Sequence, residues 1–122
     1  MTKWYQAIII KGINLGKSLG FPTLNLDNPR LLSGYKEGVY AAKVIIDRKE
    51  YTGVLYYGPR LILGEKENIL EIFVFDFHKE VYGRRISFQV WDFIRQAQNF
   101  PDFFSFQKQL RKDCQKAKEI LK

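Results

Sequence analysis

GVYAAKVIIDRKEYTGVLYY, residues 38–57, is the stretch that decides the fold class of this chain. Two runs rich in β-branched and aromatic residues, 38–47 and 50–57, flank the polar pair Arg48 and Lys49. Such runs favour strands, and a short polar interval between two of them is typical of a β-hairpin. The stretch therefore predicts two antiparallel strands joined by a tight turn.

Four more strands are predicted on either side of this hairpin. Residues 4–11 and 23–26 precede it, and residues 69–77 and 85–94 follow it. Each run is rich in aliphatic or aromatic residues, and glycine, proline or polar residues separate one run from the next. With the hairpin, these runs make six strands joined mostly by short connections.

The C-terminal segment has a different period. From Ser105 onward, apolar side chains recur every three or four residues, which predicts an amphipathic helix with Ser105 as a candidate N-cap. Six strands and one closing helix predict a mainly β fold, a six-stranded antiparallel β-barrel with a C-terminal α-helix. The apolar positions of the helix are Phe106, Leu110, Cys114, Ala117 and Leu121.

The composition indicates a single globular domain spanning residues 1–122. Apolar residues make up 46% of the chain, which is enough for a packed core. The single cysteine, Cys114, excludes an intramolecular disulfide, and no apolar run reaches the ~18 residues of a membrane span. The first ten residues lack the pattern of a signal peptide. We expect a cytoplasmic monomer that does not associate with membranes.

The net charge favours anionic partners. Lysine and arginine number 20 against 13 acidic residues, a formal charge of +7, which suits nucleotides, nucleic acid or acidic lipid without choosing among them. Much of the excess lies in the predicted helix, where a solvated face is the ordinary explanation. The basic residues of that face are Lys108, Arg111, Lys112, Lys116, Lys118 and Lys122.

A glycine-rich segment follows the first predicted strand. Gly12, Gly16 and Gly20 stand four residues apart and lead into Pro22. The backbone N–H groups of such a loop can surround phosphate oxygens, and Lys17 would add a full positive charge. The spacing matches neither a Walker A nor a dinucleotide-binding pattern, so a purely architectural turn is the alternative.

The next segment, PTLN at residues 22–25, carries two neutral oxygen groups. Thr23 and Asn25 are two positions apart and project to one face of a strand. A hydroxyl and an amide oxygen suit Mg²⁺, which prefers oxygen ligands and shares its coordination with nucleotide phosphates. The alternative is a Thr/Asn pair that hydrogen-bonds local backbone.

Glu71 is the candidate general base. In the predicted strand 69–77 it shares a face with Phe73, Phe75 and Phe77, whereas Asp76 projects to the opposite face. Burial against aromatic rings raises the pKa of a carboxyl group and makes it a better proton acceptor. A solvent-exposed glutamate near the strand end is the alternative.

Together and in this order, these segments resemble the riboflavin kinase family, including the kinase domain of bifunctional FAD synthetases. The resemblance covers nearly the whole chain, and its most specific part is LGFPTLNL at residues 19–26. The other matching segments are Gly38-Val-Tyr-Ala41, Gly53-Val54, Glu71 with Phe75-Asp-Phe77, Tyr82-Gly83, Ile94-Arg95, and the helix residues Leu110, Asp113 and Ala117.

The resemblance implies a barrel enzyme that transfers the γ-phosphate of ATP to the 5′-hydroxyl of riboflavin, with Mg²⁺ as cofactor and FMN and ADP as products. It implies ATP and metal binding by Thr23 and Asn25, catalysis by Glu71, and flavin binding by Arg95 and Phe100. The further nucleotide positions that it implies are Gly12, Gly16, Lys17, Gly20, Val74, Asp76 and Tyr82.

Four positions depart from the family pattern. Asn14 replaces a glycine of the loop, Tyr56 begins an altered segment after Gly53-Val54, Phe73 replaces a histidine, and Ala97 replaces a glutamate. No adenylyltransferase domain precedes the kinase-like segment, so FAD synthesis is not expected of this chain.

Two rival functions stay open beside the kinase. A basic, aromatic-rich small barrel can bind single-stranded nucleic acid. A flavin-binding protein of the same fold without kinase activity is the other rival. Our expectation is binding of riboflavin or FMN and of ATP or ADP, without nucleic acid.

Overall fold

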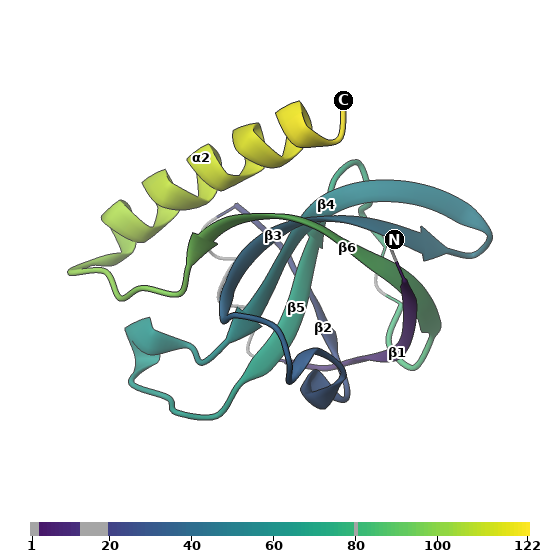
Figure 1. Cartoon of the computed structure of the whole chain (residues 1–122), viewed down its shortest axis with the longest axis horizontal. Coiled ribbons are helices and arrows are strands. Elements are labelled where there is room, and N and C mark those ends of the chain that lie inside the picture. The colour runs from purple at the N-terminus through teal and green to yellow at the C-terminus, as the bar shows by residue number, and fades with distance from the viewer. Residues whose placement is uncertain (1–2, 13–19, 80) are drawn as a thin grey trace.

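A closed antiparallel barrel forms the body of the molecule (Figure 1). The computed structural model describes residues 3–12, 20–79 and 81–122. Around the barrel the strands follow the order β1-β2-β5-β4-β3-β6, and helix α2 lies across one side. The predicted fold, six antiparallel strands with a C-terminal helix, is confirmed. The elements are β1 (Trp4–Ile10), β2 (Leu24–Leu26), η1 (Pro29–Leu32), β3 (Gly38–Ile46), β4 (Lys49–Gly58), η2 (Leu61–Leu63), β5 (Ile69–Val74), β6 (Arg85–Gln96) and α2 (Phe103–Ile120).

The barrel interior holds the main hydrophobic core. Because side chains alternate between the two faces of a strand, every second residue points inward. On β5 these are Leu70, Ile72 and Val74, and on β4 they include Leu55 and Tyr57. Inward residues of the other strands complete a core whose largest fully buried side chain is Phe88.

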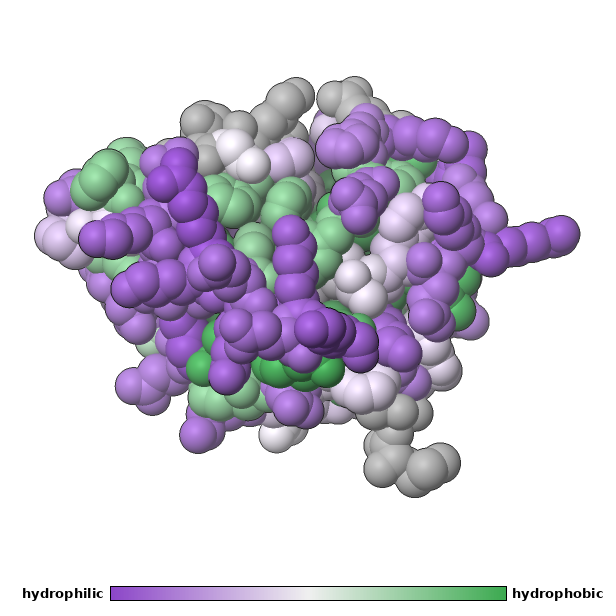
Figure 2. Space-filling model, turned by 90° about the horizontal axis from the view of Figure 1, so that it is seen from above, coloured by the Kyte–Doolittle hydropathy of each residue, from purple (hydrophilic) through white to green (hydrophobic). Residues whose placement is uncertain are grey.

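Helix α2 covers the outer face of β3, β4 and β6. A second cluster of buried residues lies beneath it and contains Val39, Val54, Phe75 and Ala117. Seen from above, the molecule presents a mostly hydrophilic surface (Figure 2), and the six basic residues predicted for the solvated face of the helix are all exposed. Among the described residues, no helix has the length and apolar composition needed to cross a membrane.

The start of α2 differs from the prediction. The helix begins at Phe103, and its N-cap is Asp102, whose side chain accepts a hydrogen bond from the Ser105 backbone N–H at 2.7 Å. The prediction of Ser105 as N-cap was wrong. Two consecutive phenylalanines obscured the boundary, because Phe103 and Phe104 are exposed and do not belong to the apolar stripe.

Strand β5 is shorter than predicted. It ends at Val74, and Asp76 adopts a left-handed conformation with φ of 59°, which turns the chain. Phe73 and Phe75 therefore remain with the cluster under the helix, whereas Phe77 packs against the barrel interior. The predicted common face with Glu71 holds for Phe73 and Phe75 but is wrong for Phe77.

The central hairpin turns one residue earlier than predicted. Ile46 pairs with Lys49, which leaves Asp47 and Arg48 as the two turn residues. Both have positive φ, 51° and 68°, as a type I′ turn requires. An ion pair between Asp47 and Arg84 ties this turn to the start of β6.

Candidate active site

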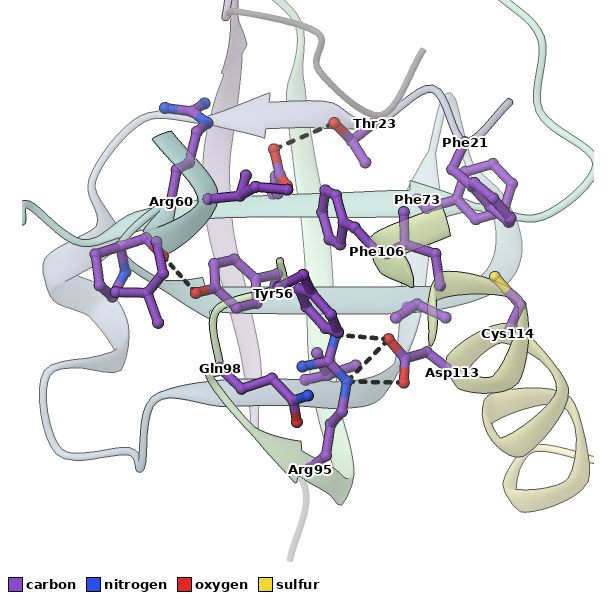
Figure 3. Close-up of a pocket in the computed structure, with 18 residues that line it drawn as sticks. Phe21, Thr23, Tyr56, Arg60, Phe73, Arg95, Gln98, Phe106, Asp113 and Cys114 are labelled. Carbon is purple, nitrogen blue, oxygen red and sulfur yellow. Dashed lines mark hydrogen bonds and ion pairs between the residues drawn. The ribbon is translucent and has the colours of Figure 1, made fainter. Parts of the chain in front are cut away.

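The candidate active site is a pocket between helix α2 and the outer wall of the barrel (Figure 3). Outward-facing residues of β3, β4 and β5 form its floor, the end of β6 with the following segment forms one side, and α2 forms another. Its apolar walls come from Phe21, Val39, Val54, Phe73, Phe106 and Leu110. Its polar lining includes Thr23, Tyr56, Arg60, Glu71, Arg95 and Asp113.

Thr23 and Glu71 line one end of this pocket, and Asn25 lies beside Glu71 and borders a second hollow. Asn25 on β2 is the direct cross-strand partner of Glu71 on β5, so their side chains project to the same outer face. The Thr23 hydroxyl, just before β2, donates a hydrogen bond to Glu71 Oε2 at 3.2 Å. These three residues, predicted from two separate segments, are therefore adjacent in space.

Burial perturbs the Glu71 carboxyl group. Desolvation raises the pKa of Glu71, while the positive charge of Arg60 and the hydrogen bond from Thr23 oppose that rise. The balance leaves the pKa above the ordinary value of 4.5. A carboxylate that is more basic than usual is suited to accept a proton.

Arg60 completes this end of the pocket and was not predicted. It directly precedes η2, and its Nη2 donates to Asn25 Oδ1 at 3.0 Å. Its Nη1 donates to Glu65 Oε1 at 3.2 Å. The turn signal Gly58-Pro59 marked its segment as a loop, but no local pattern indicates that a loop arginine reaches a strand 35 positions away in the sequence.

Gly12 lies directly against Asn25. A Cβ atom at Gly12 would stand 2.2 Å from Asn25 Cγ, which is well inside van der Waals contact. A side chain at this position would therefore displace the Asn25 amide. The first glycine of the predicted phosphate loop thus lies beside a predicted metal and phosphate residue.

The oxygens at this end fit a magnesium ion. A hydroxyl and an amide oxygen, from Thr23 and Asn25, are oxygen donors of the kind that Mg²⁺ prefers, and Mg²⁺ completes its coordination with waters and nucleotide phosphates. The described residues contain no cluster of three or more His, Cys, Asp or Glu side chains that would hold a metal by itself. The site therefore fits a metal that arrives with a nucleotide.

The other end of the pocket is built around Arg95 and Asp113. Arg95 Nε and Nη2 bind both carboxylate oxygens of Asp113, with N–O distances of 2.9 to 3.1 Å. Asp113, on α2, is only 1% exposed and also accepts a hydrogen bond from Gln109. The Arg95 guanidinium lies 5.5 Å from the centre of the Phe100 ring. The two predicted flavin residues, Arg95 and Phe100, thus line the same pocket as Glu71.

The other predicted nucleotide positions that the structure describes lie in different settings. The Val74 side chain is 3% exposed and belongs to the barrel core, so it is not available to a ligand. Asp76 is exposed in the turn after β5, and Tyr82 is 42% exposed with Lys11 Nζ 5.7 Å from its ring centre. Gly20 has a left-handed φ of 87° and open space around it. Gly16 and Lys17, like Asn14, lie outside the described residues.

Three other residues depart from the family pattern, and each makes contacts within the protein. The Tyr56 hydroxyl donates to the Pro59 carbonyl, and burial raises the pKa of Tyr56 to about 12. The Phe73 ring meets the rings of Phe21 and Phe75 edge to face. The Ala97 N–H donates to the Glu37 carbonyl at 3.2 Å. Tyr56 and Phe73 therefore make this pocket more aromatic.

Comparisons with known proteins agree with this architecture. The model of the Flavokinase family, described as riboflavin kinase, matches residues 4–121. The chain is 37% identical over 106 residues to the RNA-binding riboflavin kinase RibR of Bacillus subtilis, covering 86% of this chain and 45% of that protein. It is 35% identical over 111 residues to the bifunctional riboflavin kinase/FMN adenylyltransferase of Haemophilus influenzae, covering 90% of this chain and 36% of that protein.

A solved structure shares the fold. The riboflavin kinase from Trypanosoma brucei aligns with a TM-score of 0.69 at 20% identity, over 97% of this chain and 78% of that one. The chain spans less than half the length of the two bacterial relatives. The family match over nearly the whole chain, together with the barrel and its pocket, shows that this chain belongs to the riboflavin kinase family.

Proposed function

We propose that this chain transfers the γ-phosphate of ATP to the 5′-hydroxyl of riboflavin, giving FMN and ADP. The observation that carries the proposal is the placement of Thr23 and Glu71 at one end of an apolar pocket, with the Thr23 hydroxyl bonded to Glu71 and Asn25 paired with Glu71 across the adjoining strands. Family membership supports the same reaction.

Glu71 is the proposed general base. Its raised pKa makes it a better acceptor for the proton of the ribityl hydroxyl. The hydrogen bond from Thr23 orients the carboxylate toward the pocket end where Asn25 lies. Such positioning of reacting groups accounts for much of the catalysis in phosphoryl transfer.

Thr23 and Asn25 are the proposed metal and phosphate residues. Mg²⁺ bound there with ATP would neutralise charge on the phosphate oxygens. Gly12, the first glycine of the predicted loop, lies against Asn25, so this residue of the loop is next to a proposed metal ligand. Lys17 would add a positive charge from the part of the loop outside the described residues.

The flavin is proposed to occupy the apolar part of the pocket. Val39, Val54, Phe73, Phe106 and Leu110 offer flat or aliphatic surface suited to a planar heteroaromatic ring. Arg95 and Phe100 would then border the ring on the side opposite Glu71. This orientation directs the ribityl chain toward the proposed base.

The test is direct product analysis. Purified chain incubated with riboflavin, ATP and Mg²⁺ is expected to form FMN, detected by chromatography, and to form none when Mg²⁺ is removed with EDTA. Riboflavin binding without FMN formation under any metal condition would favour the rival, a flavin-binding protein without kinase activity. Failure to bind riboflavin would reject both.

Nucleic acid is not among the proposed partners, although one relative is named as RNA-binding. This chain covers 45% of that relative, so the name does not assign RNA binding to the shared part. The basic face of α2 is nevertheless exposed and would suit an RNA backbone. If the chain bound an oligonucleotide with an affinity that falls steeply with salt, nucleic acid would have to be added to its partners. Riboflavin is uncharged, so its binding should vary little with salt.

A further inference from the structure

Arg60 stands between two hollows of the surface. One is the pocket that contains Thr23 and Glu71, and the other is bordered by Gly12 and Asn25. Its side chain is 13% exposed, and it lies at the end of the pocket away from Arg95 (Figure 3). Arg60 is therefore a positive charge that borders both the pocket of the proposed base and the hollow beside Gly12.

The contacts of Arg60 leave part of its guanidinium available. One nitrogen donates to the neutral Asn25 amide oxygen, and another donates to Glu65, whose side chain is 35% exposed. A guanidinium carries five N–H groups in a planar fork that matches the oxygens of a phosphate. Neither described contact uses the fork in a bidentate way.

The Asn25 oxygen is the atom that the proposed metal site needs. Asn25 Oδ1 is 3.0 Å from Arg60 Nη2, and a coordinated Mg²⁺ would lie about 2.1 Å from the same oxygen. Two cations so close to each other repel strongly in a partly buried site. Binding of the metal at Asn25 therefore disfavours the contact between Arg60 and Asn25.

A released guanidinium needs a new acceptor. A charged donor left without a hydrogen-bond partner in a partly buried position is costly, and the phosphates that arrive with the metal offer anionic oxygens at the same place. We propose that Arg60 occupies the Asn25 oxygen in the ligand-free protein and moves to a phosphate oxygen of ATP when metal takes that place. Arg60 is thus a phosphate-binding residue whose contribution depends on the metal.

The inference rests on the proposed function, in that ATP must bind at this site, and it predicts a specific coupling. Arg60→Met should weaken ATP binding about tenfold or more in the presence of Mg²⁺, the size expected from losing a charge-assisted hydrogen bond. In EDTA the same substitution should change ATP affinity by less than about threefold, because Arg60 then stays on Asn25. Simple loss of one positive charge predicts the opposite order, with the larger loss for metal-free ATP, which carries more negative charge.

Calorimetric titration of ATP without riboflavin measures these affinities without turnover. Arg60→Lys, which keeps the charge but not the fork, should show an intermediate loss with Mg²⁺ and serves if Arg60→Met does not fold. Glu65→Gln removes the loop ion pair while keeping Arg60 and should bind MgATP as wild type does. Lys66→Met removes an exposed charge from the same loop and should also have no effect.

Three results would overturn the inference. Equal losses with and without Mg²⁺ would mean that Arg60 binds phosphate without leaving Asn25 for the metal. An unchanged MgATP affinity in Arg60→Met, with normal FMN formation by the wild type, would sink this inference and leave the proposed function standing. A wild-type protein that binds no ATP would reject both.

Discussion

Two arginines lie at opposite ends of the pocket, and their partners differ (Figure 3). Arg95 is bound through two nitrogens to Asp113, a carboxylate that is 1% exposed and is held by Gln109 as well. Arg60 makes single contacts with a neutral amide and with the more exposed Glu65. Arg95 holds one buried carboxylate through two nitrogens, whereas Arg60 makes one hydrogen bond to each of two groups.

These different partners give the two arginines different expected roles, Arg95 in stability and Arg60 in catalysis. A buried bidentate pair between β6 and α2 fixes the helix over the pocket, and removing one partner would leave an uncompensated charge. The Arg60 end holds a perturbed carboxyl group and oxygens suited to a metal, and its contacts are easier to exchange. We therefore expect substitutions at the Arg60 end to change catalysis and substitutions at the Arg95 end to change stability.

The largest expected effect is that of Glu71→Gln. Loss of a general base lowers turnover by about 10²- to 10⁴-fold, while MgATP affinity should stay close to wild type because the amide keeps the shape of the side chain. Steady-state FMN formation and calorimetric ATP titration measure the two effects. Glu67→Gln, at an exposed position before β5, is the matched control. Turnover of Glu71→Gln within about threefold of wild type would remove Glu71 from the role of base.

Asp113→Asn should cause the largest loss of stability. It leaves Arg95 partly buried without a countercharge, and breaking such a pair costs about 3–5 kcal/mol in free energy of unfolding. Urea denaturation followed by circular dichroism measures the loss, with the exposed Asp92→Asn as control. A loss of unfolding free energy below about 1 kcal/mol would show that the pair of Arg95 and Asp113 does not stabilise the fold as expected.

Gly12→Ala should have an intermediate effect, confined to catalysis. The new Cβ would displace the Asn25 side chain, so we expect kcat/KM to fall about tenfold while the free energy of unfolding changes by less than about 1 kcal/mol. Gly34→Ala is the control, since a Cβ there meets nothing within 4 Å. Equal kcat/KM for the two variants would show that the contact between Gly12 and Asn25 does not matter for the reaction.

The smallest expected effect concerns the pH dependence of stability. Because burial raises the pKa of Glu71 in the folded protein, folding favours the protonated carboxyl group, and its contribution is fully present below the unfolded pKa. That contribution is lost as the pH rises through the folded pKa. Glu71→Gln mimics the protonated form, so its stability relative to wild type should increase from pH 4 to pH 8. If the difference in unfolding free energy between Glu71→Gln and wild type stayed constant from pH 4 to pH 8, the pKa of Glu71 would not be raised.

Runs of β-branched and aromatic residues, separated by turn-forming residues, were enough to predict the six strands. The same alternation placed Thr23 and Asn25 on one face of a strand and Glu71 on the face of Phe73, and the structure adds the pairing of β2 with β5 that makes Asn25 and Glu71 neighbours. The alternation could not reveal where β5 ends, because the apolar run continues through Phe77 although the chain turns at Asp76. Local patterns therefore predict which face a residue occupies better than where an element stops.

The two arginine contacts are set by tertiary structure. Arg60 meets Asn25 across 35 positions of sequence, and Arg95 meets Asp113 across 18. Nothing in the local sequence distinguishes these arginines from the many exposed basic residues of a chain with a formal charge of +7. Resemblance to the family indicated Arg95 as a flavin residue, but only the structure places Asp113 beneath it and Arg60 at the opposite end.

Locating the metal tests the central claim most directly. Crystals grown with MnCl₂, ADP and FMN would give an anomalous difference map in which the manganese peak marks the metal. The account predicts a peak within coordination distance of Thr23 Oγ1 or Asn25 Oδ1, with the phosphate of FMN near the Glu71 carboxylate. A metal and phosphates bound elsewhere on the barrel, with Glu71 facing neither, would contradict it.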